Sequence, residues 1–284
     1  MLMEKSLNTS LRSSRGFSMV ELAIVILIIS TLLGAILGAR EVVRTVRLKK
    51  IGAEVQGFGV AARAFEQKYE ALPGDFDAAD EVIAGCRVNG DGTPNNPNFC
   101  RNGDGNGIIG SNCHFADGGC QRGQTGALSV GNEKMETSLF WKHLLLSGYI
   151  TGIVEARANP ANPRWRETHP ESAVWDSGYV ISAQDGFIGG SVVVHFIPFP
   201  EYLSSAAQQP SNKGDERSLT LNDAHYIDDK FDNGGPGSGA IWWDPVANDV
   251  NDPSGCRYND SGAQNTWETR FPDERNCVFS WTVF

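Results

Sequence analysis

A long apolar segment near the N-terminus constrains the fold of this 284-residue chain more than any other feature. Almost every residue from Leu22 to Ala39 is apolar, and the segment is 23 residues long when it is counted from Phe17. A helix of that length covers about 34 Å at roughly 1.5 Å per residue. Because the hydrocarbon core of a bilayer is about 30 Å thick, we expect residues 17–39 to form a membrane-spanning helix.

One carboxylate, Glu21, lies inside this segment, and no Lys or Arg accompanies it there. An acid in hydrocarbon costs on the order of a few kcal/mol, so it is expected to have a functional partner. The cation at hand is the α-amino group that cleavage after Gly16 would create at Phe17. The sequence therefore predicts that Glu21 pairs with a new amino terminus.

The junction resembles the class III signal of type IV pilins and type II secretion pseudopilins, in which a basic leader ends in Gly and is followed by Phe, three residues and Glu. Here the pattern reads Gly16, Phe17, Ser18-Met19-Val20, Glu21. The resemblance implies that a prepilin peptidase cleaves after Gly16 and N-methylates Phe17. It also implies that Glu21 pairs with the amino terminus of a neighbouring subunit in a filament.

Two alternatives explain the segment less well. An ordinary secretory signal needs a small-residue cleavage site after the apolar run, and Gly38-Ala39-Arg40 is a poor one. A plain single-span anchor leaves both the Gly-Phe junction and Glu21 unexplained.

The charges that flank the segment conflict with the expected orientation. Five basic residues follow the span, and the positive-inside rule alone would place the C-terminal part in the cytoplasm. Six cysteines instead favour an oxidising compartment, and the resemblance also places that part outside the inner membrane.

An amphipathic pattern continues beyond the apolar segment and ends at Leu72-Pro73-Gly74-Asp75. Its apolar positions recur at spacings of three and four, which predicts a helix over 40–71 with one apolar face. We expect that face to pack on an antiparallel sheet; a coiled coil is the rival, weakened by three glycines. The stripe consists of Leu48, Ile51, Val55, Phe58, Ala62, Phe65 and Tyr69.

The remaining chain is expected to be an α+β head. Residues 1–16 are expected to be a leader peptide. Residues 72–132 are expected to form a Gly-, Asn- and Cys-rich loop insertion, and residues 133–284 a β-rich globular head. A second helix is expected near 133–149, with Gly148 as its stop. Strand-like runs are predicted at 178–182, 190–197, 218–221, 240–243 and 277–284.

Two places could hold calcium. Asn102, Asp104 and Asn106 alternate with glycines, and the Ile108 carbonyl follows, as in the first positions of an oxygen-ligand loop. The twelfth position is Cys113, so Asp117 or an acid from elsewhere, such as Glu133, would have to complete the site. The alternative is a solvated Asn-Gly turn cluster held by disulfides.

The second place is Asp228 and Asp232, with Asp223 as a further ligand. The resemblance implies it, because pseudopilins of the type II secretion system use a C-terminal acidic loop for calcium. Lys230 among these acids favours a surface ion pair instead.

Six cysteines allow fifteen pairings, and structural disulfides are favoured over zinc because no CxxC spacing occurs. Nearness in sequence favours three pairs, which are Cys86 with Cys100, Cys113 with Cys120, and Cys256 with Cys277.

Enzyme signals are weak, because the five histidines form no metal-binding pair and Ser238 lacks the spacing of a nucleophile elbow. The net charge of −10, about −12 without the leader, disfavours nonspecific nucleic-acid binding. We therefore predict neither catalysis nor a nucleic-acid partner.

The chain is thus predicted to be a prepilin-like subunit of a type IV pilus or type II secretion pseudopilus. Many pilins carry proline where this chain has Gly38, which favours a minor subunit. Expected partners are other pilin or pseudopilin subunits, a prepilin peptidase and an inner-membrane assembly platform. The head would be periplasmic before assembly, and the filament periplasmic or extracellular afterwards. The alternatives are a filament-tip adhesin that binds through loops 76–132 and 244–276, and a membrane-anchored periplasmic enzyme.

Overall fold

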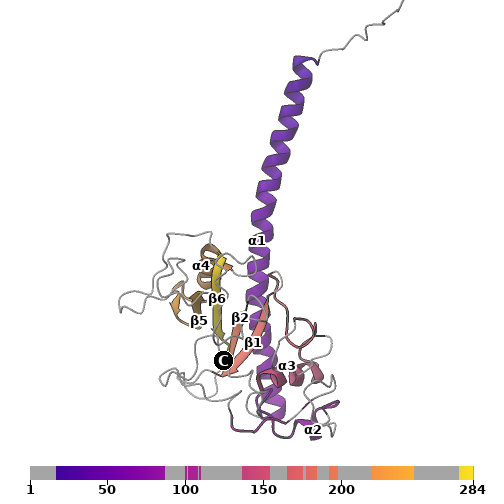
Figure 1. Cartoon of the computed structure of the whole chain (residues 1–284), viewed down its shortest axis with the longest axis vertical. Coiled ribbons are helices and arrows are strands. Elements are labelled where there is room, and N and C mark those ends of the chain that lie inside the picture. Colours follow the sequence, from indigo (N-terminus) through magenta and orange to yellow (C-terminus); the bar gives the residue numbers. More distant parts are fainter. Residues whose placement is uncertain are drawn as a thin grey trace, which may run out of the picture. The chain divides into compact units, whose positions relative to one another are not determined.

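The computed structural model describes residues 17–86, 100, 102–107, 109, 136–153, 165–174, 177–183, 192–197, 219–245 and 275–283. It divides the chain into two compact units, 1–46 and 47–284. The first helix, α1, spans Met19–Tyr69 and contributes to both (Figure 1). The predicted leader at 1–16 and much of the predicted loop insertion at 72–132 lie outside the described residues.

The second unit contains one antiparallel sheet with the strand order β1-β2-β6-β5-β4, and β3 also pairs with β6. The yellow strand β6 pairs with β2, β3 and β5, and so occupies the middle of this arrangement (Figure 1). The strands are β1 (Gly178–Ala183), β2 (Val192–Ile197), β3 (Leu219–Thr220), β4 (Gly237–Ser238), β5 (Ile241–Pro245) and β6 (Arg275–Thr282). The α+β architecture predicted from the sequence is confirmed.

The C-terminal part of α1 packs on this sheet through the predicted stripe. Leu48, Ile51, Val55 and Phe65 are buried in the same core as the aromatic side chains of β1, β2 and β6. Phe58 makes an edge contact with Tyr179 of β1, with 5.2 Å between the ring centroids. Because the helix buries one face against the sheet of its own chain, the coiled-coil alternative is not needed to explain the stripe.

Gly52 permits one of the closest approaches to α1. A methyl group at this position would overlap the ring of Phe231, the last residue of α4 (Leu221–Phe231). A glycine inside a helix costs roughly 1 kcal/mol relative to alanine. The close approach of Phe231 gives that cost a structural reason.

Two further helices follow α1, namely α2 (Ala79–Val82) and α3 (Glu136–Leu146). The helix α3 lies within the predicted range 133–149. Gly148 follows it with a positive φ of 76°, and its N–H donates to the Leu145 carbonyl. Glycine adopts this left-handed conformation without strain, so the predicted stop is present.

The helix α4 is not among the elements predicted from the sequence. The prediction extends a strand to Leu221 and assigns the following acids to a calcium site or a surface ion pair, whereas the structure begins a helix at Leu221. Thr220 caps it by accepting from the Asp223 N–H, while Asp223 accepts from the Thr220 N–H. This reciprocal pair is a capping box. The sequence carried the signal as Thr220-x-x-Asp223, followed by apolar residues at helical spacing.

Candidate functional site

The junction at the start of α1 is the first candidate site. Phe17 and Ser18 precede the helix, and the Phe17 side chain is 77% exposed. Glu21 lies in the first turn, where its Oε2 accepts a hydrogen bond from the Ser18 N–H at 3.3 Å. Gly16 lies outside the described residues. The Glu21 carboxylate thus lies next to the backbone of Ser18, the second residue after the predicted cleavage point.

The N-terminal part of α1 is apolar and leaves its side chains uncovered within the described chain. Large apolar residues from Met19 to Leu37 are all about half or more exposed. The helix is long and apolar enough to cross a membrane. Exposed apolar patches of this size mark a surface that lipid or protein covers.

Three carboxylates form an acidic group beside α3. The ligand oxygens of Asp75, Asp104 and Glu136 lie within 4.8 Å of one another. Asp75 and Glu136 are buried, and Asp104 is exposed. The Asp104 N–H donates to Glu136 Oε1 at 2.8 Å. Such a group offers the oxygen ligands that calcium prefers.

Backbone donors also fix the Asp75 carboxylate. Its Oδ1 accepts from the Asn106 N–H at 3.0 Å, and its Oδ2 accepts from the Gly107 N–H at 2.8 Å. Burial is the main cause that raises the pKa of Asp75 to about 6; Asp104 acts in the same direction, and the hydrogen bonds from Gly107 and Asn106 act against it. A cation bound nearby would lower the pKa of Asp75, because it favours the charged carboxylate.

The structure assembles this acidic group differently from the predicted calcium loop. Asp104 is brought to Asp75 and Glu136, which the sequence did not single out as ligands. Asn102 instead pairs with Asp80, donating to Asp80 Oδ1 at 2.7 Å. Asn106 donates to Asp104 Oδ2 at 2.9 Å. Ile108, Asp117 and Glu133 lie outside the described residues.

The second predicted calcium place sits on and after α4. Asp228 is fully buried, and its Oδ2 accepts from the Trp243 indole N–H at 2.8 Å. Its Oδ1 has no hydrogen-bond partner among the described residues. Asp232 Oδ2 accepts from the Ile241 N–H at 2.9 Å. Among the described residues, no group of three ligand side chains forms here.

The environment of Asp228 disfavours its charged form. Burial raises its pKa to about 6, and the Asp232 charge acts in the same direction. Asp223 lies at the opposite end of α4, where its carboxylate takes part in the capping box. The structure therefore does not bring Asp223 into one site with Asp228 and Asp232.

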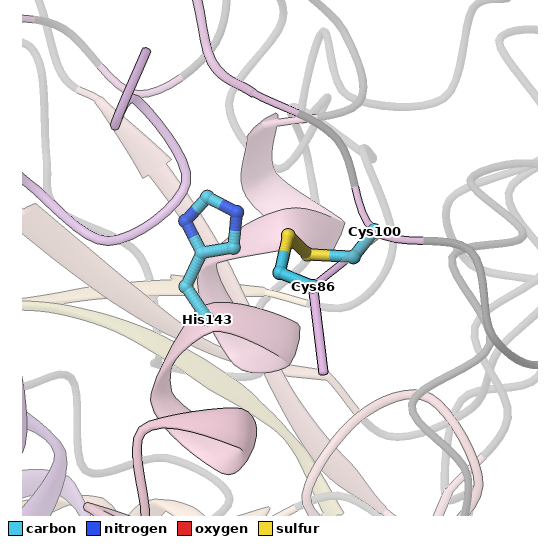
Figure 2. Close-up of side chains that lie close together, drawn as sticks. All are labelled: Cys86, Cys100 and His143. Atoms are coloured by element: carbon cyan, nitrogen blue, oxygen red, sulfur yellow. A yellow bond between two sulfur atoms is a disulfide. The ribbon is translucent and has the colours of Figure 1, made fainter. Parts of the chain in front are cut away.

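The predicted disulfide between Cys86 and Cys100 is present, and His143 of α3 lies beside it (Figure 2). All three side chains are buried, and their sulfur and nitrogen atoms lie within 4.8 Å of one another. Sulfurs joined in a disulfide are not thiolates, which are the form of cysteine that binds metals. In this oxidised state the three residues do not form a metal site.

The hydrogen bonding of His143 agrees with this assignment. The Gly74 N–H donates to His143 Nδ1 at 2.9 Å, so the neutral ring carries its proton on Nε2. Figure 2 shows Nε2 on the side of the ring that faces the disulfide. A protonated nitrogen cannot coordinate a metal. His143 thus fixes the turn at Gly74 against α3.

The other cysteines are only partly described. Cys277 on β6 is disulfide-bonded, and its partner lies outside the described residues. Its predicted pairing with Cys256 stays a prediction, as does the pair Cys113 with Cys120.

Comparison with known families identifies the N-terminal segment. A family model described as the prokaryotic N-terminal methylation motif matches residues 11–37. No curated protein and no solved structure matches the chain. The matched residues include the Gly16–Phe17 junction, Glu21 and most of the apolar segment. The chain therefore carries the N-terminal methylation motif that is the signature of type IV pilins and pseudopilins.

Proposed function

We propose that this chain is a minor subunit of a type IV pilus or type II secretion pseudopilus, cleaved between Gly16 and Phe17 and methylated at Phe17. The observation that carries the proposal is the motif match over residues 11–37 at the start of an uncovered apolar helix. This motif indicates a structural subunit rather than an enzyme. It also implies other pilin subunits and the prepilin peptidase as partners.

The assembly mechanism follows from the cost of an isolated carboxylate in lipid. Cleavage creates a positive amino group at Phe17, and Glu21 is the acid near it in the apolar segment. Pairing Glu21 with the Phe17 amine of a neighbouring subunit neutralises both charges and fixes the axial register of the two helices. The pairing is favourable because each charge alone costs on the order of a few kcal/mol in hydrocarbon.

The decisive experiment combines mass spectrometry of the mature N-terminus with a matched pair of variants. The wild-type protein from cells is expected to begin at methylated Phe17. Glu21→Gln keeps the shape and a hydrogen-bond acceptor but removes the charge, so it is expected to be cleaved normally and to enter filaments at least tenfold less. Ser30→Ala, in the same segment, is the control. A wild-type protein that begins at Met1 or beyond residue 39 contradicts the proposal, as does normal filament entry of the Gln variant.

We also propose that the head, from residue 40 onward, lies outside the cytoplasm and is anchored in the inner membrane by residues 17–39. An inner-membrane assembly platform would then move the subunit into the filament. The disulfides support this location, because they persist in oxidising compartments. A reporter enzyme that is active only in the periplasm, fused after Val283, is expected to be active. Inactivity of that fusion, with activity of a cytoplasmic reporter at the same point, contradicts the orientation.

We also propose that Asp75, Asp104 and Glu136 bind calcium in the head. The supporting observations are the 4.8 Å grouping and the pKa of Asp75, which is raised to about 6. Ligand binding stabilises the folded state by mass action. Calcium at 1–2 mM, on the order of the concentrations that extracellular modules sense, should raise the melting temperature of the full chain in detergent. Asp104→Asn should abolish that increase, and Asp80→Asn should not. An unchanged melting temperature of the wild type contradicts calcium binding.

A further inference from the structure

A cluster of basic residues follows the apolar segment directly. Five of the eleven residues at positions 40–50 are Lys or Arg, and one, Glu41, is an acid. This stretch therefore has a net charge of +4 in a chain whose net charge is −10. The five cations, which we call the basic collar, are Arg40, Arg44, Arg47, Lys49 and Lys50.

The collar belongs to the same helix as the apolar segment, because α1 is continuous from Met19 to Tyr69. At about 1.5 Å per residue, the collar extends to about 16 Å beyond Ala39, where the apolar segment ends. The headgroup region on one side of a bilayer is roughly 5–8 Å thick. Each Cα–Cβ bond of a helix leans toward the N-terminus, which here is the direction of the apolar segment. The long side chains of the collar therefore lean toward the headgroups, which they can reach with their charged ends.

The collar is accessible on more than one side of the helix. Arg40, Lys49 and Lys50 are exposed, and Arg44 and Arg47 are half-buried. Arg40 and Lys49 are nine positions apart, so they lie on opposite sides of the helix at about 100° per residue. Lipid surrounds a helix on all sides, whereas a protein partner covers one face. The distribution of charge therefore favours lipid as the partner.

The ion pairs in this region leave the collar able to bind phosphate. Arg44 pairs with Glu41 at 3.5 Å, and both side chains are exposed. Lys50 pairs with Glu54 at 3.6 Å, and the Lys50 side chain is 65% exposed. Ion pairs that involve exposed side chains are weak, because water screens them. They compete poorly with the phosphates of a charged membrane surface.

The position of the collar also calls for a reason. In the proposed orientation it lies on the side of the membrane opposite the cytoplasm, where Lys and Arg next to a span are disfavoured. Clusters of four to eight cations beside a membrane helix attract anionic lipids. Binding of such lipids gives the charge of the collar a function on that side.

We propose that the basic collar binds the phosphate groups of anionic phospholipids, such as phosphatidylglycerol, in the leaflet from which the head emerges. This inference rests on the proposed function, since it takes residues 17–39 as a membrane anchor. The binding fixes the depth of α1 in the bilayer before the subunit joins a filament.

The test is native mass spectrometry of the full chain in detergent micelles with equal amounts of phosphatidylglycerol and phosphatidylcholine. These lipids differ in net headgroup charge, so the ratio of their apparent Kd values measures the preference for the anionic lipid. In Arg40→Gln/Lys49→Gln this preference should fall about fivefold or more, because each cation near an anionic surface contributes about 1 kcal/mol, which is a factor of about five. Added salt should lower the preference of the wild type.

The matched control is Arg63→Gln/Lys68→Gln, which removes the same charge from exposed positions of the same helix. These positions lie about 35 Å or more beyond Ala39, which is several Debye lengths, so the preference should equal that of the wild type. The comparison of variants is needed because the predicted leader is basic as well and adds to the preference of the wild type. Circular dichroism checks that both variants are folded.

The outcomes separate the collar from its rivals. Equal affinity of the wild type for the two lipids overturns the inference, as does an equal loss in both double variants. An unchanged lipid preference in Arg40→Gln/Lys49→Gln, with weaker cross-linking between two copies of the chain, also overturns it and assigns the collar to a protein partner. A chain that is not cleaved at Gly16–Phe17 but keeps the collar-dependent preference refutes the proposed processing and supports the collar.

Discussion

The two parts of α1 have opposite environments although they belong to one continuous helix. Up to Val46 the large apolar side chains are exposed, whereas Ile51, Val55 and Phe65 are fully buried against the sheet. From Leu22 to Ala39 the first part is apolar on almost every side, and the second part is apolar along one stripe. An all-round apolar helix needs an external apolar environment, while a striped helix needs one surface. Among the described residues, the sheet covers the second part, whereas the first part is uncovered and suits an external apolar environment.

The largest expected effect comes from a core residue in the second part. Phe65→Ala should lower the free energy of unfolding of the head by about 4 kcal/mol, because it opens a cavity among Phe76, Tyr69 and Tyr149. Ile26→Ala, an exposed position in the first part, should change it little. Denaturant unfolding followed by near-ultraviolet circular dichroism measures both. Equal effects of the two variants would break the comparison.

The disulfide gives the next effect. Replacing both Cys86 and Cys100 with Ser should destabilise the head by about 3 kcal/mol, as the loop-entropy model predicts for a closed loop of this length. The same double variant should leave cleavage at Gly16–Phe17 unchanged, because the junction belongs to the first unit. Urea unfolding and a cleavage assay test the two statements. Impaired cleavage in a folded variant would show that the units are coupled.

Asp228 should make head stability depend on pH. Its folded pKa of about 6 exceeds the usual value of 3.8, so the native state binds more protons than the unfolded state between these values. The free energy of unfolding should therefore fall by on the order of 2 kcal/mol as the pH rises from 4 to 6. Asp75 contributes in the same window, so Asp228→Asn should remove part of the slope and stabilise the head at pH 7.

The control for this pH dependence is Asp229→Asn, an exposed position on the same helix. Its curve of unfolding free energy against pH should follow the wild type. An unchanged slope in Asp228→Asn would contradict a buried carboxylate that protonates near pH 6.

The smallest effect concerns glycines in the second part of α1. Gly57→Ala should stabilise the head by up to about 1 kcal/mol, because nothing lies within 4 Å of the added methyl group and alanine favours the helix. Gly52→Ala should instead destabilise it by about 1 kcal/mol, because the methyl group displaces Phe231. Thermal melting distinguishes the signs. Stabilisation by both variants would mean that Phe231 does not need the space at Gly52.

Several features were predictable because their signals are local or periodic. The apolar segment, the Gly16–Phe17 junction and the stripe from Leu48 to Tyr69 are read from neighbouring or regularly spaced residues. Strands β1, β2 and β6 carried β-branched and aromatic residues in the same way. The Cys86–Cys100 pair followed from nearness in sequence.

Other features needed the folded chain. The helix α4 is one of them, because acidic residues are common both in loops and on helix surfaces, and the capping box of Thr220 and Asp223 is a short signal that many loops also carry. The acidic group joins Asp75 to Asp104 and Glu136, which are 29 and 61 positions away. No periodicity links these positions.

The sequence by itself determined the N-terminal methylation motif and the apolar helix, because those properties reside in consecutive residues. It also determined that the rest of α1 has one apolar face. Only the tertiary structure decided which sheet covers that face, which carboxylates meet and why Gly52 is a glycine. Those contacts join segments distant in sequence, and their distances depend on how the intervening chain folds.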